Sequence, residues 1–251
     1  HHLLSAAGSS PAAAAAANKR FADKNSQEMQ RLDLYDRYQA LAHGIKTQNL
    51  LELLQKNPDE KKIIFAHHRE TLAHLDQTFN NQHISFARFD GSMSGKEKDE
   101  AIEFFRDHVS VLLCTESGGE GRNLQFCNTL INYDLPWNPM VIEQRIGRIH
   151  RIGQKREVFV FNLAVLGTLE EQILYLLDEK INMFELVVGE IGAILGEMED
   201  TEDFSELVFN AWMASSEQDR SSQFETLGEQ ITAAKGQYDS AKQLDEELFG
   251  E

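Results

Sequence analysis

The residues best suited to chemistry are a glutamine and two arginines at helical spacing. Gln144, Arg148 and Arg151 occupy positions i, i+4 and i+7, so a helix through them would present all three on one face. A guanidinium group carries a planar fork of donors that fits a terminal phosphate, and two of them can stabilise the charge that develops during phosphoryl transfer. Such a pattern is compatible with an arginine-finger arrangement. The alternative is an exposed basic helix turn that only meets solvent.

Two short glycine-containing segments could also approach a phosphate. The run Gly118 to Gly121 follows an expected strand, and a glycine turn lets backbone N–H groups come close to a sugar or phosphate. Gly91 and Ser92 follow another expected strand, where a backbone amide and a small hydroxyl can bind a phosphate without reading a base. Either segment could equally be an ordinary tight turn, so neither identifies a site by itself.

A longer, gapped pattern supplies a family resemblance. Trp137-Asn138-Pro139 is followed at fixed intervals by Gln144, Arg148 and the run His150 to Gln154, and this pattern resembles motif VI of the Snf2 family of superfamily 2 helicase-like ATPases. Residues 112–124 resemble motif V, residues 89–92 the short motif between IV and V, and residues 62–68 the motif IV strand. The resemblance covers residues 40–190 and is closer to bacterial members, such as those that recycle RNA polymerase, than to eukaryotic chromatin remodellers.

The resemblance implies a role for each candidate residue. Arg148 and Arg151 would reach the γ-phosphate of ATP, with Gln144 helping to align them. Gly121 and Asn123 would lie near the ATP ribose. The residues that would contact the nucleic-acid backbone are His67, Gly91, Ser92 and Thr115. The implied cofactor is ATP with Mg²⁺.

A phosphate cradle is missing from the sequence. ATP hydrolysis in this class needs a GxxxxGK[ST] loop and a separate acidic pair that holds magnesium. The run Gly91 to Glu97 is one residue short between its glycines and has no hydroxyl after Lys96, so it is not such a loop. The sequence therefore represents half of a two-lobe ATPase, in which an N-terminal lobe would hold most of the phosphates and the Mg²⁺.

Charge is distributed unevenly along the chain. The formal net charge is -17, but residues 1–166 contain 20 basic and 20 acidic residues, whereas residues 167–251 contain 4 and 21. The front part is neutral and can still carry a basic patch, for which the candidates are Arg145, Arg148, Arg151, Lys155 and Arg156. An acidic total therefore does not exclude DNA. We expect that removing residues 215–251 would raise nonspecific DNA affinity, unless this tail is only solvated.

Compartment and metal chemistry follow from simple patterns. No apolar run approaches the length of a bilayer span and no secretory signal pattern appears, so the sequence predicts a soluble, cytoplasmic protein without a membrane partner. Cys114 and Cys127 fall in or beside apolar runs, which predicts buried free thiols. His67, His68 and His74 lack the Cys or carboxylate spacing of a metal motif, so no metal site is predicted.

The pattern of apolar residues predicts an α/β fold. Five short apolar runs, over residues 62–66, 84–89, 109–115, 129–133 and 158–163, alternate mainly with helical stretches over 68–80, 95–106 and 140–148. This alternation indicates a RecA-like parallel sheet with helices on both faces. The predicted divisions are a low-complexity, tag-like segment (1–20), a helical run-in (21–57), the lobe (58–166), a helical C-terminal extension (167–214) and an acidic polar tail (215–251).

These observations favour the C-terminal lobe of an ATP-dependent translocase on double-stranded DNA. Its partners would be that DNA, the N-terminal lobe of the same protein, and a protein partner such as RNA polymerase or another protein–DNA complex. One alternative is a binding module that works through its acidic tail. A second is a strand-separating superfamily 2 helicase that acts on RNA or forked DNA. A phosphate-binding loop and an acidic pair in the missing N-terminal half would support the ATPase over the binding module.

Overall fold

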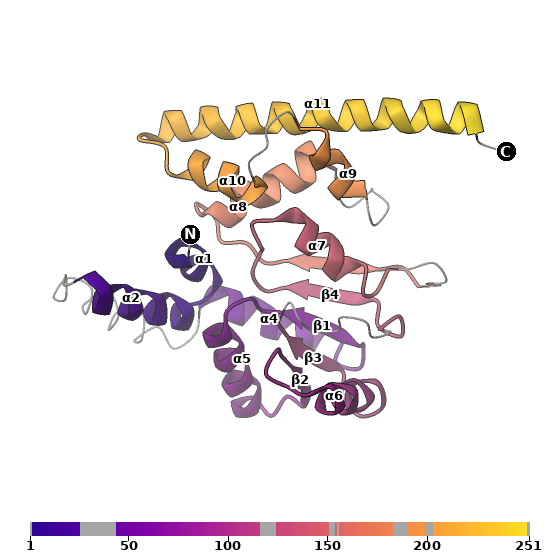
Figure 1. Cartoon of the computed structure of the whole chain (residues 1–251). Coiled ribbons are helices and arrows are strands. Elements are labelled where there is room, and N and C mark those ends of the chain that lie inside the picture. The colour runs from indigo at the N-terminus through magenta and orange to yellow at the C-terminus, as the bar shows by residue number, and fades with distance from the viewer. Residues whose placement is uncertain are drawn as a thin grey trace.

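The computed structural model describes residues 2–25, 44–115, 124–150, 154, 156–182, 190–198 and 203–249. At its centre is a five-stranded parallel sheet in the order β2-β3-β1-β4-β5 (Figure 1). The strands are β1 (Lys62–Phe65), β2 (Phe86–Phe89), β3 (Val111–Cys114), β4 (Thr129–Asn132) and β5 (Phe159–Asn162). All five predicted strands are therefore confirmed, with ends that differ by up to two residues.

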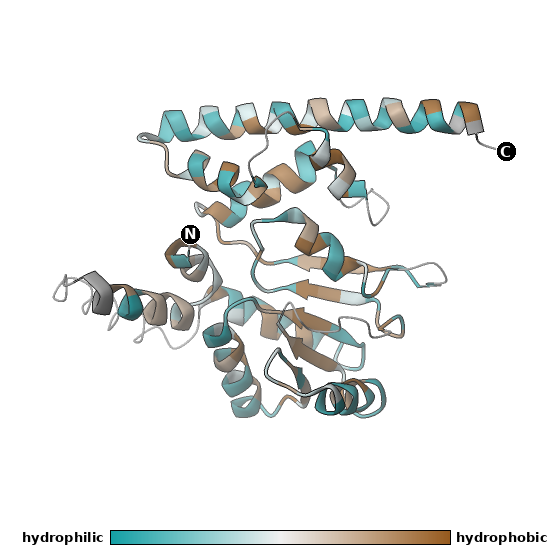
Figure 2. Cartoon of the chain, in the orientation of Figure 1, coloured by the Kyte–Doolittle hydropathy of each residue, from teal (hydrophilic) through white to brown (hydrophobic). Residues whose placement is uncertain are grey.

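Burial explains why the central strands read as continuous apolar runs. β1, β3 and β4 are buried at every position because helices cover both faces of the sheet, whereas β5 at the edge alternates between exposed and half-buried residues. On one face, α4 (Ile45–Lys56) and α5 (Arg69–Asn81) pack on Ile64, Leu113 and Ile131. On the other face, α6 (Gly95–Asp107) packs on Ile63 and Leu112. Figure 2 shows the strands as the most hydrophobic part of the lobe.

The N-terminal residues form two packed helices. They are α1 (His2–Ser9) and α2 (Pro11–Asn25), and the buried alanines include Ala6, Ala13 and Ala17. Ser9 is also buried, and its hydroxyl donates to Asp134 Oδ2 at 2.7 Å. In addition, α2 contacts α5. Residues 1–20 therefore pack on the lobe, which their low-complexity composition did not indicate. Most of the predicted helical run-in before residue 44 lies outside the described residues.

After the sheet, the chain forms a layer of helices, which we call the helical layer (Figure 1). It comprises α8 (Leu169–Tyr175), the π-helix η1 (Leu176–Lys180), α9 (Glu190–Gly196), α10 (Phe204–Trp212) and α11 (Glu217–Phe249). The predicted helix after residue 168 is thus confirmed in its first part, and it ends near Asn182, whose φ is +55°. The short helix expected over residues 203–213 is confirmed as α10.

The acidic tail is a helix and is partly buried. The 33 residues of α11 lie along the outside of the helical layer, and Phe224, Leu227 and Ile231 are buried in its core. The expectation of a solvated tail is therefore wrong for the first half of α11. These three residues are three and four positions apart, which is the spacing that places side chains on one face of a helix, so together they bury one face of α11.

Candidate nucleic-acid and nucleotide interfaces

All four predicted nucleic-acid residues line one pocket. His67, Gly91, Ser92 and Thr115 come from loops that follow β1, β2 and β3, and they surround a cavity of about 390 Å³. The ends of neighbouring parallel strands meet at one edge of the sheet, which we call the carboxyl edge, and this brings the loops together. Two arginines that were not predicted from the sequence, Arg69 and Arg88, line the same pocket. Arg69 directly follows the motif IV histidines, which could have indicated it.

The turn at Gly91 and Ser92 is held by Asp90. The Asp90 carboxylate accepts a hydrogen bond from the backbone N–H of Ser92 at 2.8 Å and another from the Ser92 hydroxyl. Arg88 Nε donates to the same carboxylate at 2.8 Å, and Arg88 Nη1 reaches Asp76 at 3.0 Å. Burial acts to raise the pKa of Asp90, but the bonds from Ser92 and Arg88 hold it below its usual value. Asp90 therefore fixes the turn as an anion.

Residues 94–97 form a capping box at the start of α6. Ser94 is the N-cap of α6, and its hydroxyl accepts from the backbone N–H of Glu97 at 3.4 Å. The Glu97 carboxylate accepts in return from the backbone N–H of Ser94 at 2.7 Å. This capping box satisfies the donors at the start of the helix with protein groups.

Asp134 joins the carboxyl ends of β1 and β4. It follows β4 and is buried, and its two carboxylate oxygens accept from the backbone N–H of His67 at 2.9 and 3.0 Å. Ser9 of α1 donates to Asp134 as well, and the Ser9 hydroxyl lies 2.7 Å from that of Thr71. The backbone of the motif IV loop is therefore fixed by a buried hydrogen-bond network that includes the N-terminal helix.

Gln144 lies near the end of α7 (Pro139–Ile146), and Arg148 lies just beyond it. Gln144 is exposed on this helix, and the half-exposed Arg148 follows in a turn whose backbone N–H donates to Arg145 O at 3.1 Å. The helix ends two residues earlier than predicted, so Gln144 and Arg148 are separated by one turn that is only partly α-helical. Arg151, Gly121 and Asn123 lie outside the described residues, so their roles stay predictions.

Arg145 does not belong to a surface basic patch. It is only 2% exposed, and its Nη1 donates to Asn132 Oδ1 at 2.7 Å and to Asp134 O at 3.1 Å. The guanidinium also lies over the Phe65 ring, 4.9 Å from the centroid. The prediction that Arg145 contributes to an exposed patch is therefore wrong. The helical phase of α7 turns this side chain toward the sheet while Gln144 points outward.

Trp137 anchors its loop to the helical layer. Its ring stacks on Phe209 of α10 with centroids 6.2 Å apart and an interplanar angle of 18°. Trp137 is only 9% exposed and belongs to the core of the helical layer. A base-stacking role is therefore excluded in this conformation. Trp137 therefore holds the loop before α7 against α10 and not against the sheet.

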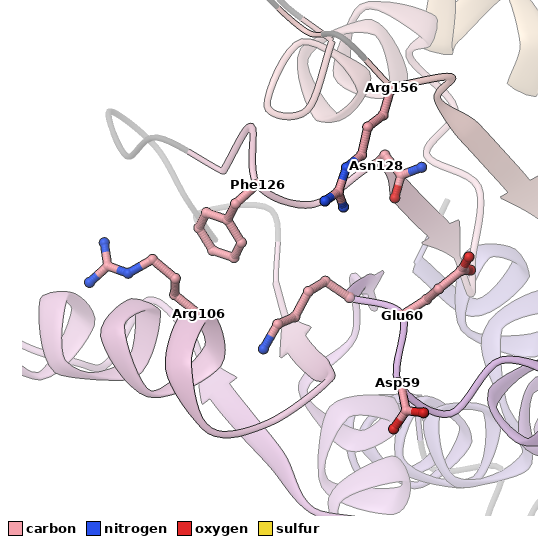
Figure 3. A pocket seen from close by; sticks show the side chains of 7 residues that line it. Asp59, Glu60, Arg106, Phe126, Asn128 and Arg156 are labelled. Atoms are coloured by element: carbon pink, nitrogen blue, oxygen red, sulfur yellow. The ribbon is translucent and has the colours of Figure 1, made fainter.

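A second cavity, of about 560 Å³, lies at the opposite edge of the sheet, beside the residues that precede β1, β4 and β5. Figure 3 shows Arg106 and Arg156 on one side of it with the Phe126 ring between them, and Asp59 and Glu60 on the other side. The fifth charged group, Lys61, donates to Phe105 O and Val109 O at 2.7 Å each, which ties it to the end of α6. The opposing charges nearly balance, so no sign dominates this cavity.

Neither cysteine is suited to reactivity. Cys114 and Cys127 are free and buried, as predicted. Burial raises the pKa of the Cys127 thiol to about 11 and that of Cys114 still further. Among the described residues there is no cluster of three or more His, Cys, Asp or Glu side chains that could hold a metal ion. In the described part of the chain, no helix combines the length and the apolar character that a membrane span requires.

Comparison with known proteins places this geometry in a family. Residues 45–153 match the family described as the helicase conserved C-terminal domain. The chain is similar to an uncharacterized ATP-dependent helicase, YqhH of Bacillus subtilis, with 45% identity over 183 residues that cover 70% of this chain and 33% of YqhH. It is 39% identical over 139 residues to the RNA polymerase-associated protein RapA of Vibrio vulnificus, which covers 54% of this chain and 14% of RapA.

A solved structure supports the fold. The helicase domain of Hef from Pyrococcus furiosus superposes with a TM-score of 0.51 at 22% identity, covering 70% of this chain and 40% of that chain. The chain spans about one third or less of the length of the curated relatives described above. The chain therefore contains a helicase conserved C-terminal domain with a RecA-like fold, and its resemblance to bacterial members of the Snf2 family of helicase-like ATPases is confirmed.

Proposed function

We propose that this chain is the C-terminal lobe of an ATP-dependent translocase that moves on double-stranded DNA. In the intact protein, ATP with Mg²⁺ would lie between two lobes, and the N-terminal lobe would hold most of the phosphates and the metal. Arg148 and Arg151 would contact the γ-phosphate, with Gln144 aligning them and with Gly121 and Asn123 near the ribose. Closure and opening of the two lobes around ATP would then move their DNA contacts relative to each other.

The observation that carries the proposal is the pocket at the carboxyl edge. Three loops from different parts of the sequence bring together His67, Ser92 and Thr115, and Arg69 adds an exposed positive charge. Backbone amides, small hydroxyls and arginines bind phosphates without distinguishing bases. These groups suit a protein that tracks along a backbone whatever its sequence.

Partners and compartment follow from the same reasoning. The RapA relative is RNA polymerase-associated by name, so we propose RNA polymerase or another protein–DNA complex as the class of protein partner. We place the protein in the cytoplasm, consistent with its two reduced, buried cysteines. A strand-separating helicase acting on RNA would use the same phosphate contacts. It is distinguished by a preference for RNA or forked substrates over a plain duplex.

The DNA contact can be tested with two arginines that carry the same charge at opposite edges of the sheet. In the full-length protein, Arg69→Ala should weaken duplex binding equally for all sequences and reduce the slope of log affinity against log salt by about 1. Arg106→Ala, at the second cavity, is the matched control and should leave both quantities unchanged. Equal effects of the two substitutions would show that the carboxyl edge is not the DNA surface.

A second test separates the two lobes. Because the chain supplies finger residues without a phosphate cradle, the isolated chain should show no DNA-stimulated ATP hydrolysis and at most weak ATP binding. Turnover by the purified chain that Arg148→Ala abolishes would contradict the proposal.

A further inference from the structure

Helix α7 is anchored on two opposite sides. Residues two apart on an α-helix point about 200° away from each other. Glu143 and Arg145 are such a pair, and both are buried, whereas Gln144 between them is exposed. The two anchors therefore leave only the Gln144 side of the helix free.

The first anchor ties α7 to the sheet. Arg145 bonds to the side chain of Asn132 and to the backbone carbonyl of Asp134, at 2.7 and 3.1 Å. Asn132 in turn donates from Nδ2 to Asn162 Oδ1 of β5 at 2.7 Å, so Arg145 reaches a link between two strands. A fixed guanidinium fork in this position determines both the height and the rotation of α7 on the sheet.

The second anchor ties α7 to the helical layer. Glu143 Oε1 accepts from the backbone N–H of Ile191 in α9 at 3.1 Å. The approach is close, because a Cβ atom placed on Gly192 would lie 3.2 Å from Met140 Cε. Ile142 is completely buried in the core of the helical layer, and Trp137 ahead of the helix stacks on Phe209.

We propose that Glu143 and Arg145 are positioning residues that hold α7 between the sheet and the helical layer, and that this clamp sets the position of Gln144 and Arg148. The inference rests on the proposed function of Arg148. The helical layer contains none of the predicted site residues, but the clamp would allow it to influence ATP hydrolysis. The influence passes through α9 and α10 to α7.

The clamp can be loosened from the side of the helical layer, without changing α7. In the full-length protein, Phe209→Ala removes the stacking partner of Trp137, and Asn210→Ala, at the next, exposed position of α10, is the matched control. We expect Phe209→Ala to lower kcat for ATP hydrolysis about 10-fold, since small misplacements of catalytic groups cost up to about 10². In Phe209→Ala, the DNA concentration for half-maximal stimulation should stay at its wild-type value. The melting temperature of the Asn210→Ala control should also stay at the wild-type value.

A double-mutant cycle separates positioning from general destabilisation. If Phe209 acts through Arg148, then Phe209→Ala should have no further effect once Arg148→Ala is present. If it only destabilises the protein, the two losses in kcat should multiply, which would overturn the clamp. Wild-type hydrolysis by Arg148→Ala alone would instead overturn the proposed function of the finger.

Variants of Glu143 test the same anchor from α7. Glu143→Gln keeps an oxygen that can accept from Ile191, whereas Glu143→Leu removes it. We expect Glu143→Leu to lower kcat about 10-fold and Glu143→Gln to retain most of it. Equal losses in the two variants would show that this hydrogen bond does not position α7.

Discussion

The RecA-like lobe and the helical layer solve the problem of burying apolar surface in different ways. The lobe uses five short strands, most of them covered on both faces, and its charged residues nearly balance. The helical layer uses amphipathic helices that bury one face each, and it carries the acidic excess on the other. The lobe contains the motifs that suggest chemistry, and the helical layer packs on the helix that carries part of them.

A buried ion pair marks the junction of the two regions. Lys46 Nζ of α4 lies 2.7 and 2.6 Å from the two carboxylate oxygens of Glu170 in α8 and also donates to Tyr133 O at 3.1 Å. The same carboxylate accepts from the backbone N–H groups of Leu135 and Val165 at 3.4 and 3.3 Å. Burial raises the pKa of Glu170 to about 7 despite its cationic partner. The sequence contained no signal for this pairing, because its partners are 124 residues apart.

The largest effect is expected where the lobe acts on ATP. In the full-length protein, Arg148→Ala or Arg151→Ala should lower the rate of ATP hydrolysis by about 10³-fold or more, while DNA affinity stays nearly unchanged. Arg148→Lys should restore little activity, because an ammonium group cannot replace the planar fork of guanidinium donors. Steady-state hydrolysis assays at saturating DNA would measure both effects. Wild-type rates would show that this face of α7 does not meet the nucleotide.

The next largest effect is expected at the junction. Lys46→Met leaves a buried carboxylate without its partner and should lower the free energy of unfolding by about 3–5 kcal/mol. The loss should be smaller at pH 5 than at pH 8, because Glu170, with a pKa of about 7 in the folded protein, is already mostly neutral at pH 5. Urea unfolding at both pH values would measure it.

The control for this experiment is another lysine of the same helix. Lys56→Met changes the same residue type at an exposed position of α4 and should alter stability by less than about 0.5 kcal/mol. If the two variants unfolded alike, the Lys46–Glu170 pair would not join the lobe to the helical layer.

The structure of the RecA-like lobe was easier to predict from the sequence than that of the helical layer, and the reason is physical. The strands were predictable because alternating elements impose a parallel sheet. The four residues of the carboxyl-edge pocket were predicted from the family resemblance, and they meet in the structure because the ends of parallel strands share one edge. Arg145 was misassigned, since a charged residue within a basic run usually faces solvent and only tertiary contacts with Asn132 and Asp134 bury it. The packing of α11 was missed although Phe224, Leu227 and Ile231 lie at helical spacing, because the many polar and acidic residues around them hide this short apolar stripe.

The smallest effect concerns the acidic tail, and the packing of α11 changes how it must be tested. Removing residues 215–251 would take Phe224, Leu227 and Ile231 out of the core of the helical layer. A cut before Gln243 removes four acidic residues and no basic one, and it keeps the contact of Lys242 with Glu190 at 2.6 Å. We expect this shorter deletion to raise nonspecific duplex affinity modestly at low salt and not at high salt. Coincident salt titrations of the two proteins would identify the tail as a solvated segment.

The most direct test of the account is a DNA titration of ATP hydrolysis in the full-length protein, because one curve reports the DNA contact and the chemical step separately. We predict that Arg148→Ala lowers the plateau about 10³-fold and leaves the DNA concentration at half-maximum unchanged. We predict that Arg69→Ala raises that concentration and leaves the plateau near the wild-type value. The opposite result would be that Arg148→Ala shifts the DNA concentration at half-maximum while Arg69→Ala lowers the plateau of ATP hydrolysis. It would contradict both assignments, because DNA would then contact the region of Arg148 and the nucleotide would contact the region of Arg69.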